Sequence, residues 1–201
     1  QSGPKQEHPA YDCVIQAFAG VVAANGHSER DTMRVGPAMM DYGTGAQAAL
    51  AISAALYGRS VNGVGRRIDV AMADAALMLQ NSCTVQALAT GKGSIPHGSA
   101  DPNIAGYCSY ETASGELMLG AFTNKQMAGL MRVLGYDEQA SALEVLPRAE
   151  IGGRRAGDVA LIGEMLVTRA AAEWEELFNA HHIPAARVRR LEESLQEAQF
   201  A

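Results

Sequence analysis

Cysteine is scarce in this sequence: Cys13, Cys83 and Cys108 are the only three, spread over 201 positions. An odd and widely spaced set fits free thiols in a reducing compartment better than a disulfide framework. We therefore expect a cytoplasmic protein. The sequence has no Cys-x-x-Cys pair, and the adjacent His181 and His182 lack the spacing of a helical metal pair. We predict no metal site.

Positive charge is limited as well. Lysine and arginine total 16 against 22 aspartates and glutamates, which gives a net charge of −6 and no basic face for nucleic acid or anionic lipid. The longest stretch poor in charge, residues 44–57, is shorter than the roughly 20 residues that a membrane helix needs. We expect no nucleic-acid partner and no membrane span, and interpret residues 44–57 as part of a buried helix.

Several familiar sequence signatures are missing. The sequence has no Gly-x-Ser-x-Gly elbow, no P-loop and no dinucleotide-binding fingerprint. Residues 1–5 have neither the basic start nor the apolar core of a signal peptide, and they lack an initiating methionine. We interpret the chain as processed or as a fragment.

The spacing of apolar residues predicts several elements in the first part of the chain. Asp12 is expected to cap the first helix, and Thr44 with Gln47 has the form of a capping box, so that the second helix begins near Thr44. The predicted elements are helices over residues 11–24, 44–57 and 73–90, and a strand over residues 66–72.

Residues 91–103 are crowded with glycine, proline and serine, which indicates a linker or binding loop and a domain boundary. Beyond them, residues 106–112 and 116–122 flank a glycine-containing turn and predict a β-hairpin. Further helices are predicted over residues 125–134, 159–172, 173–180 and 191–199.

Asp41 is the first candidate for chemistry, because it follows an apolar run and comes just before a predicted helix. A helix N-terminus carries roughly half a positive charge and free amide donors, which keep a nearby carboxylate ionised and oriented. An ionised, partly desolvated carboxylate can act as a nucleophile. A plain helix cap is the alternative that spacing alone favours.

Two pairs of arginines are weaker candidates. Arg66 and Arg67 could reach a phosphate, and Arg154 and Arg155 lie in what the sequence predicts to be a glycine-flanked turn. Solvated surface charge is the simpler interpretation of both pairs. The glycine-rich loop, residues 91–103, could approach a ligand closely or act as a simple hinge.

Several blocks of the sequence, taken together, resemble the family III (CaiB/BaiF-type) CoA-transferases in content, order and spacing. Residues 35–45 (Val-Gly-Pro-Ala-Met-Met-Asp-Tyr-Gly-Thr-Gly) form the central block. The others are residues 9–20, 63–74, 101–104, 110–117, 172–177 and 183–185. The resemblance covers almost the whole chain.

This resemblance implies an α/β protein that is part of the CaiB/BaiF fold, which has a Rossmann-like large domain and a small α+β domain. Residues 1–90 would belong to the large domain and carry the catalytic aspartate. Residues 91–170 would form the small domain with its loop and hairpin, and residues 171–201 a helical return segment. Family members are longer and form interlocked dimers, so we expect a homodimer and an N-terminal half that is missing here.

The resemblance also implies a mechanism, since Asp41 matches the family's nucleophile. The aspartate would attack an acyl-CoA thioester to give a mixed anhydride and then an aspartyl-CoA thioester, from which a carboxylic acid takes the CoA. Coenzyme A thioester is thus a substrate, and no tightly bound cofactor or metal is needed. Gly98, Ser99, Ala100 and Asp101 match the family's substrate loop, although the loop is less glycine-rich here, which allows hydrolysis of the anhydride.

Two other functions remain open. The same fold includes α-methylacyl-CoA racemases, in which a histidine directly precedes the aspartate of the first block. Tyr11 occupies that place before Asp12, and His8 lies three residues too early. The sequence therefore favours transfer over racemisation. The third candidate is a non-catalytic partial protein that binds CoA or assists assembly.

Overall fold

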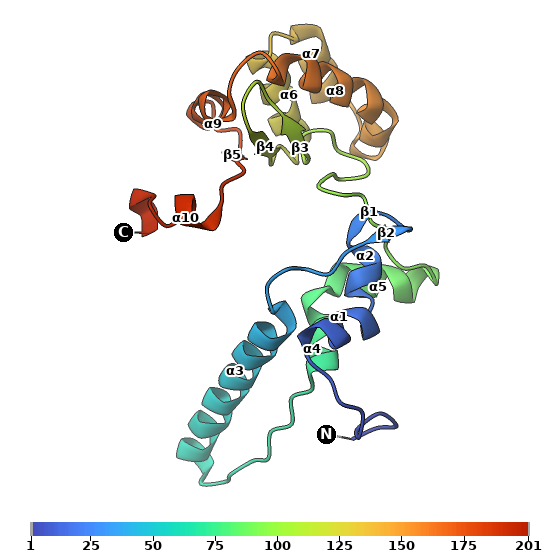
Figure 1. The fold of residues 1–201 in the computed structure, drawn as a ribbon, viewed down its shortest axis with the longest axis vertical. Helices are drawn as coiled ribbons and strands as arrows, with labels where there is room; N and C mark the ends of the chain where they lie inside the picture. The colour runs from blue at the N-terminus through green and yellow to red at the C-terminus, as the bar shows by residue number, and fades with distance from the viewer. Residues whose placement is uncertain (1, 201) are drawn as a thin grey trace. The chain divides into compact units, whose positions relative to one another are not determined.

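A computed structural model describes residues 2–200 of the chain (Figure 1). The chain divides into two compact units, Gln1–Gly98 and Ser99–Ala201. The predicted helical return segment contributes helix α9 (Ala171–Ala180) and strand β5 (Ala185–Arg187), which contact each other within the second unit. The division into three parts of a larger fold stays a prediction.

The first unit is mostly helical. Its helices α1, α3 and α4 contact one another, and its two short strands pair antiparallel. The elements in chain order are α1 (Asp12–Phe18), α2 (Val21–Ala24), β1 (Gly26–Ser28), β2 (Asp31–Thr32), α3 (Met39–Asn62), α4 (Met72–Leu79) and α5 (Asn81–Thr90).

The boundaries of the first helices differ from those predicted. The helix predicted over residues 11–24 is broken at Gly20, whose φ of +84° belongs to the left-handed region that glycine adopts easily. Asp12 is the first residue of α1 and does not cap it. Helix α3 begins at Met39, upstream of the predicted start, so Asp41 lies in its first turn. The capping box was wrong, because the Thr44 hydroxyl donates to the Met40 carbonyl instead, at 2.5 Å.

The strand predicted over residues 66–72 was also wrong. Residues 64–71 form neither helix nor strand, and Figure 1 shows them as a coil that returns from the end of α3 to α4. An alternating pattern makes a strand only when a neighbour takes up its backbone hydrogen bonds. The helix predicted over residues 73–90 is interrupted at Gln80, which separates α4 from α5.

The core of the first unit is small. Ile15, Met40 and Ala76 form its buried apolar cluster. Helix α3, expected to be buried, buries only Met40 among its residues, while its large apolar side chains, including Leu50 and Tyr57, are exposed. The alanine-rich composition of α3 therefore does not correspond to a dense interior within this unit.

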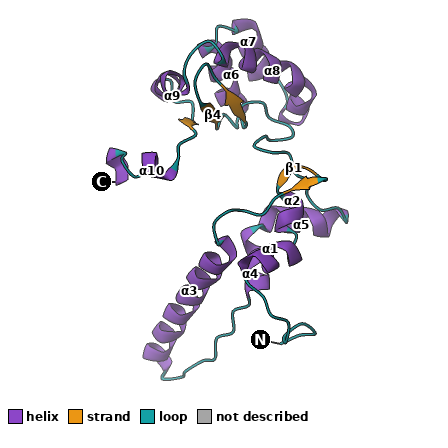
Figure 2. Cartoon of the chain, viewed as in Figure 1, coloured by secondary structure: helices purple, strands orange, loops and turns teal. Residues whose placement is uncertain are grey.

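The second unit combines helices with a three-stranded sheet (Figure 2). Its main elements are β3 (Ser109–Glu111), β4 (Glu116–Leu119), α6 (Asn124–Val133), α7 (Asp137–Val145), α8 (Ile151–Leu166), α9 (Ala171–Ala180), β5 (Ala185–Arg187) and α10 (Leu191–Ser194). Short 3-10 turns, η1 (Arg148–Glu150) and η2 (Ala198–Phe200), precede α8 and follow α10.

The predicted β-hairpin is confirmed. Strands β3 and β4 pair antiparallel, with Tyr110 opposite Leu117, and Gly115 takes a φ of +86° in the turn between them. Strand β5 adds to the other edge of β4, with Leu117 opposite Arg187, so the order is β3-β4-β5. The pairing of β5 was not predicted, because its partner lies far away in the sequence.

The helices of the second unit agree with prediction in part. Helix α6 matches the one predicted over residues 125–134, and Thr123 with Gln126 caps it. Helix α8 begins at Ile151, so the glycine-flanked turn around Arg154 and Arg155 was wrong. Helix α7 was missed, and only Leu191–Ser194 of the predicted tail helix is α-helical.

A single apolar core fills the second unit. Its largest fully buried side chains come from both the hairpin and the helices, namely Leu117, Leu119, Met127, Leu130, Met131, Leu143, Ile162, Leu166, Trp174 and Phe178. The core packs α6 through α9 against the sheet. No helix among residues 2–200 has the length and apolar character needed to cross a bilayer.

Candidate functional site

Asp41 projects from the first turn of α3, and its side chain is exposed. Within residues 2–200, no hydrogen bond or ion pair occupies its carboxylate. An acidic side chain in the first turn of a helix is stabilised by the positive end of the helix dipole. The Asp41 carboxylate is therefore free to meet a reactant at the positive end of the helix dipole.

The backbone of Asp41 is held by a second aspartate. Asp12 lies at the start of α1 and is buried, and its Oδ2 accepts hydrogen bonds from the backbone amides of Met40, at 2.7 Å, and Asp41, at 3.3 Å. Asp12 was predicted to cap its own helix, and instead it caps α3. A carboxylate that receives two amides at a helix N-terminus satisfies donors that have no partner within the helix.

Gln16 holds Asp12 in turn. It lies one turn further along α1, is fully buried, and donates from Nε2 to Asp12 Oδ1 at 2.5 Å. Its other contacts are to Val35, whose amide donates to Gln16 Oε1 at 2.9 Å and whose carbonyl accepts from Nε2 at 3.2 Å. The buried polar groups of α1 thus anchor the segment that leads to Asp41.

The remaining amides at the start of α3 are also engaged. The Met39 amide donates to the Pro37 carbonyl at 2.8 Å, and the Tyr42 amide to the Ala38 carbonyl at 3.1 Å. With the amides of Met40 and Asp41 bound to Asp12, the first turn of α3 offers no free backbone donor. Its role toward Asp41 is to position the residue and to contribute the dipole.

We predict that Asp12→Ala loosens the start of α3. The substitution leaves the buried Met40 amide and the partly buried Asp41 amide without an acceptor, which should destabilise the first unit by about 1–3 kcal/mol. Hydrogen exchange measured by mass spectrometry should quicken in peptides that cover residues 38–45. Asp12→Asn keeps an acceptor oxygen and should have a smaller effect. Unchanged exchange in Asp12→Ala would show that Asp12 does not hold α3.

Each residue of the predicted substrate loop, Gly98 to Asp101, makes a backbone contact with another part of the chain. The Gly98 amide donates to the Gly26 carbonyl at 2.7 Å, and Gly98 has a φ of +63° that disfavours other residues. Ser99 accepts from the Ser109 amide at 2.9 Å, and Ala100 forms an isolated bridge with Cys108. Gly98 belongs to the first unit and the other three residues to the second.

Asp101 organises the turn that follows this loop. Its Oδ1 accepts from the amides of Asn103, at 2.8 Å, and Ile104, at 2.9 Å, so its carboxylate is used locally. Its carbonyl accepts from Arg155 Nε at 2.8 Å. Asp101 therefore connects the loop to α8. Asp41 lies in the first unit and Asp101 in the second.

Arg154 and Arg155 are structural residues rather than solvated charges. Arg154 donates to both oxygens of the buried Asp158 carboxylate, with Nε 2.9 Å from Oδ2 and Nη2 2.9 Å from Oδ1. Burial raises the pKa of nearby Tyr110 well above its usual value, so its hydroxyl stays protonated and donates to the Ala105 carbonyl at 2.8 Å. The interpretation of this arginine pair as surface charge was wrong.

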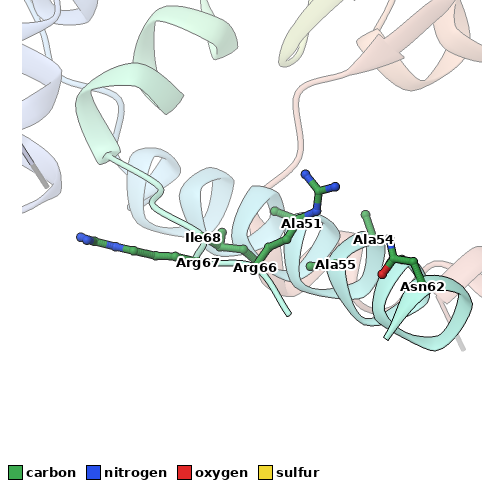
Figure 3. Close-up of a pocket in the computed structure, with 8 residues that line it drawn as sticks. Ala51, Ala54, Ala55, Asn62, Arg66, Arg67 and Ile68 are labelled. Atoms are coloured by element: carbon green, nitrogen blue, oxygen red, sulfur yellow. The ribbon is translucent and has the colours of Figure 1, made fainter. Parts of the chain in front are cut away.

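Arg66 and Arg67 border a shallow groove of about 390 Å³ on the first unit. Ala51, Ala54 and Ala55 of α3 contribute its apolar wall, and Figure 3 shows the two arginine side chains leaving the coil in different directions. Both side chains are exposed, and Arg67 lies 3.8 Å from Asp69. Exposed ion pairs of this kind contribute little stability, so the surface-charge interpretation of this pair is retained.

Sequence reasoning found Asp41 but missed the residues that hold it. The signal was present in part, because Asp12 and Gln16 are polar residues one helical turn apart in an otherwise apolar stretch. Their contact with Val35 and Met40 depends on how α1 and α3 pack. Among residues 2–200, no three metal-binding side chains cluster closely enough to hold an ion.

The fold places the chain in a known structural class. Its structure is similar to that of a CaiB/BaiF family protein from Brucella suis, with a TM-score of 0.78 and 27% identity, over 99% of this chain and 53% of the other. The sequence matches the model of CoA-transferase family III over residues 1–201. The chain therefore belongs to CoA-transferase family III, and the expected α/β fold of that family is confirmed.

Two relatives illustrate the family. A succinyl-CoA:glutarate CoA-transferase of Mus musculus is 28% identical over 206 residues, covering 99% of this chain and 46% of the relative. A succinate–glutarate CoA-transferase of Agrobacterium fabrum is 32% identical over 135 residues, covering 67% of this chain and 34% of the relative. The chain thus spans half or less of the length of these relatives.

Proposed function

We propose that this chain carries the nucleophile of a CoA-transferase that moves CoA between an acyl-CoA and a carboxylic acid. The observation that carries the proposal is the Asp41 carboxylate, which is exposed and unpaired while its backbone is fixed by Asp12. Membership of CoA-transferase family III supports the reaction class. The activity, the substrates and the partners of the whole protein are part of the proposal.

The reaction needs only carboxylate and thiolate chemistry. An Asp41 oxygen attacks the thioester carbonyl carbon, the carbon–sulfur bond breaks, and CoA leaves as a thiolate from a mixed anhydride. The thiolate then attacks Cγ of Asp41, which expels the donor acid and leaves an aspartyl-CoA thioester. The acceptor carboxylate repeats both steps in reverse and regenerates Asp41.

The surroundings of Asp41 assign separate roles to its neighbours. The positive end of the α3 dipole lies at the first turn, which carries Asp41, and Asp12, held by Gln16, fixes the backbone of Asp41 through its amide. The amides of the first turn are engaged, so hydrogen-bond donors for the tetrahedral oxyanions have to come from other groups. Contact with CoA is the role we propose for the loop Gly98 to Asp101.

The substrates proposed first are those in the names of the relatives. Succinyl-CoA is the donor and glutarate the acceptor in the name of the mouse protein. We propose a homodimer in the cytoplasm that is completed by an N-terminal half; the matched region covers 46% of the mouse relative and 53% of the Brucella suis protein. Coenzyme A enters as a thioester substrate.

Racemisation is the alternative within the same fold. It needs a base that removes the proton next to the thioester carbonyl. Tyr11 is exposed at the position before Asp12, and the carboxylate of Asp12 is occupied by the amides of α3. Neither residue offers a free base, which favours transfer. The third candidate, a non-catalytic CoA-binding or assembly partner, does not need a reactive carboxylate at Asp41.

A trapping experiment separates these functions. The chain is incubated with succinyl-CoA and then with hydroxylamine or borohydride, and its peptides are analysed by mass spectrometry. We expect a mass change on Asp41, and transfer of CoA to glutarate when glutarate is added. Exchange of the α-proton of 2-methylacyl-CoA for deuterium would support racemisation. Binding of CoA with neither adduct nor exchange would support the non-catalytic partner and contradict the proposal.

A further inference from the structure

The last residues of the second unit form a strap, residues 189–200, that follows β5. The strap contains α10 and η2 and has little apolar attachment, because Leu191, Leu195 and Phe200 are all exposed. The backbone hydrogen bonds within the strap are local, such as Leu195 amide to Leu191 carbonyl at 3.0 Å. Its position on the unit must therefore depend on other contacts.

Glu175 of α9 makes the shortest of these contacts. Its two carboxylate oxygens accept from Arg189, with Nη1 at 2.8 Å from Oε1 and Nη2 at 2.7 Å from Oε2. Both side chains are about one-fifth exposed, at 18% for Glu175 and 20% for Arg189. A bidentate arginine–carboxylate pair that is partly shielded from water is stronger than an ordinary surface ion pair.

Two further glutamates of the strap form ion pairs with Arg187 and Arg189, next to Glu175. Arg189 Nε also donates to Glu197 at 2.8 Å, and Arg187 of β5 lies 3.5 Å from Glu193 and 4.0 Å from Glu197. These bonds raise the pKa of Arg189 above its usual value, chiefly through Glu175. Within residues 2–200, the ion pairs between the strap and the rest of the unit all involve Arg187 or Arg189.

We propose that Glu175 and Arg189 form an electrostatic latch that holds the strap closed on the second unit and releases it when the pair is broken or screened. The latch differs from the rest of the unit, which is held by an apolar core. Salt weakens interactions between partly exposed charges, while burial of apolar surface is not weakened in this way. The strap is therefore a part of the unit that ionic strength can open.

Limited trypsin digestion of the full chain tests the latch. Trypsin must draw Arg189 or Arg190 into its own pocket, and cleavage of a briefly opened segment follows the population of the open form. In Glu175→Gln, which removes the charge and keeps the size, cleavage after these arginines should be about tenfold faster at low salt. Mass spectrometry identifies the released segment and its rate of appearance.

Glu176→Gln is the matched control, since Glu176 is the next residue of α9, is exposed and has no ion pair within residues 2–200. It should cleave like the unmodified chain. Raising NaCl to about 1 M, where the screening length is only about 3 Å, should speed cleavage of the unmodified chain relative to Glu175→Gln. Equal rates for Glu175→Gln and Glu176→Gln, with the fluorescence of Trp174 unchanged, would overturn the latch.

Discussion

Asp41→Asn is expected to lower CoA transfer by at least about a thousandfold and to abolish the trapped adduct. The substitution keeps the size of the side chain and its place in the first turn of α3, while it replaces a nucleophilic carboxylate by a neutral amide. The backbone N–H of residue 41 can still donate to the Asp12 carboxylate, so the start of α3 should be preserved. Transfer from succinyl-CoA to glutarate gives the rate, and peptide mass spectrometry gives the adduct.

Asp137→Asn provides the control for this experiment. Asp137 is also an exposed aspartate in the first turn of a helix, α7, and lies in the second unit. Its replacement changes the net charge by the same amount and should leave both transfer and adduct unchanged. An adduct that persists in Asp41→Asn would mean that another group attacks the thioester, and the assignment of Asp41 would fail.

Phe178→Ala is expected to destabilise the second unit by about 3–5 kcal/mol, because it empties a position at the centre of its core. Phe178 is fully buried and stacks on Trp174, with ring centroids 5.2 Å apart and planes 14° from parallel. Trp174 is the only tryptophan of the chain, so its fluorescence during urea unfolding reports on this unit. The midpoint should fall to a lower urea concentration.

Phe200→Ala is the matched control, because Phe200 is exposed in the strap and loses little contact on truncation. Its unfolding midpoint should stay close to that of the unmodified chain. If Phe178→Ala unfolds at the same urea concentration as Phe200→Ala, the stacking of Phe178 on Trp174 does not contribute to the core in the way described.

The elements predicted correctly are those with local signals. The β-hairpin has its glycine turn at Gly115, and α6 has Thr123 and Gln126 at its start. The turn predicted around Arg154 and Arg155 failed for a different reason. Helix α8 continues through Gly152 and Gly153 because the Arg154–Asp158 pair and the buried Ile151 and Ile162 outweigh the low helix propensity of glycine.

The candidate site was predictable only in part. The order of the sequence blocks predicts Asp41 as the nucleophile, and this stays a prediction; the structure places Asp41, exposed, in the first turn of α3. The part played by Asp12 was not predictable, because the bond from the Met40 amide joins residues 28 positions apart. A capping residue is normally sought within its own helix, and here it is supplied by a neighbouring one.

The division of the chain into units with separate cores has a consequence for any measurement of its stability. Cooperative all-or-none unfolding is expected of a single domain with one core. Here the cluster of Ile15, Met40 and Ala76 and the larger core around Trp174 belong to different units. One melting temperature or one free energy of unfolding does not describe such a chain, and each value has to be assigned to the unit whose signal was followed.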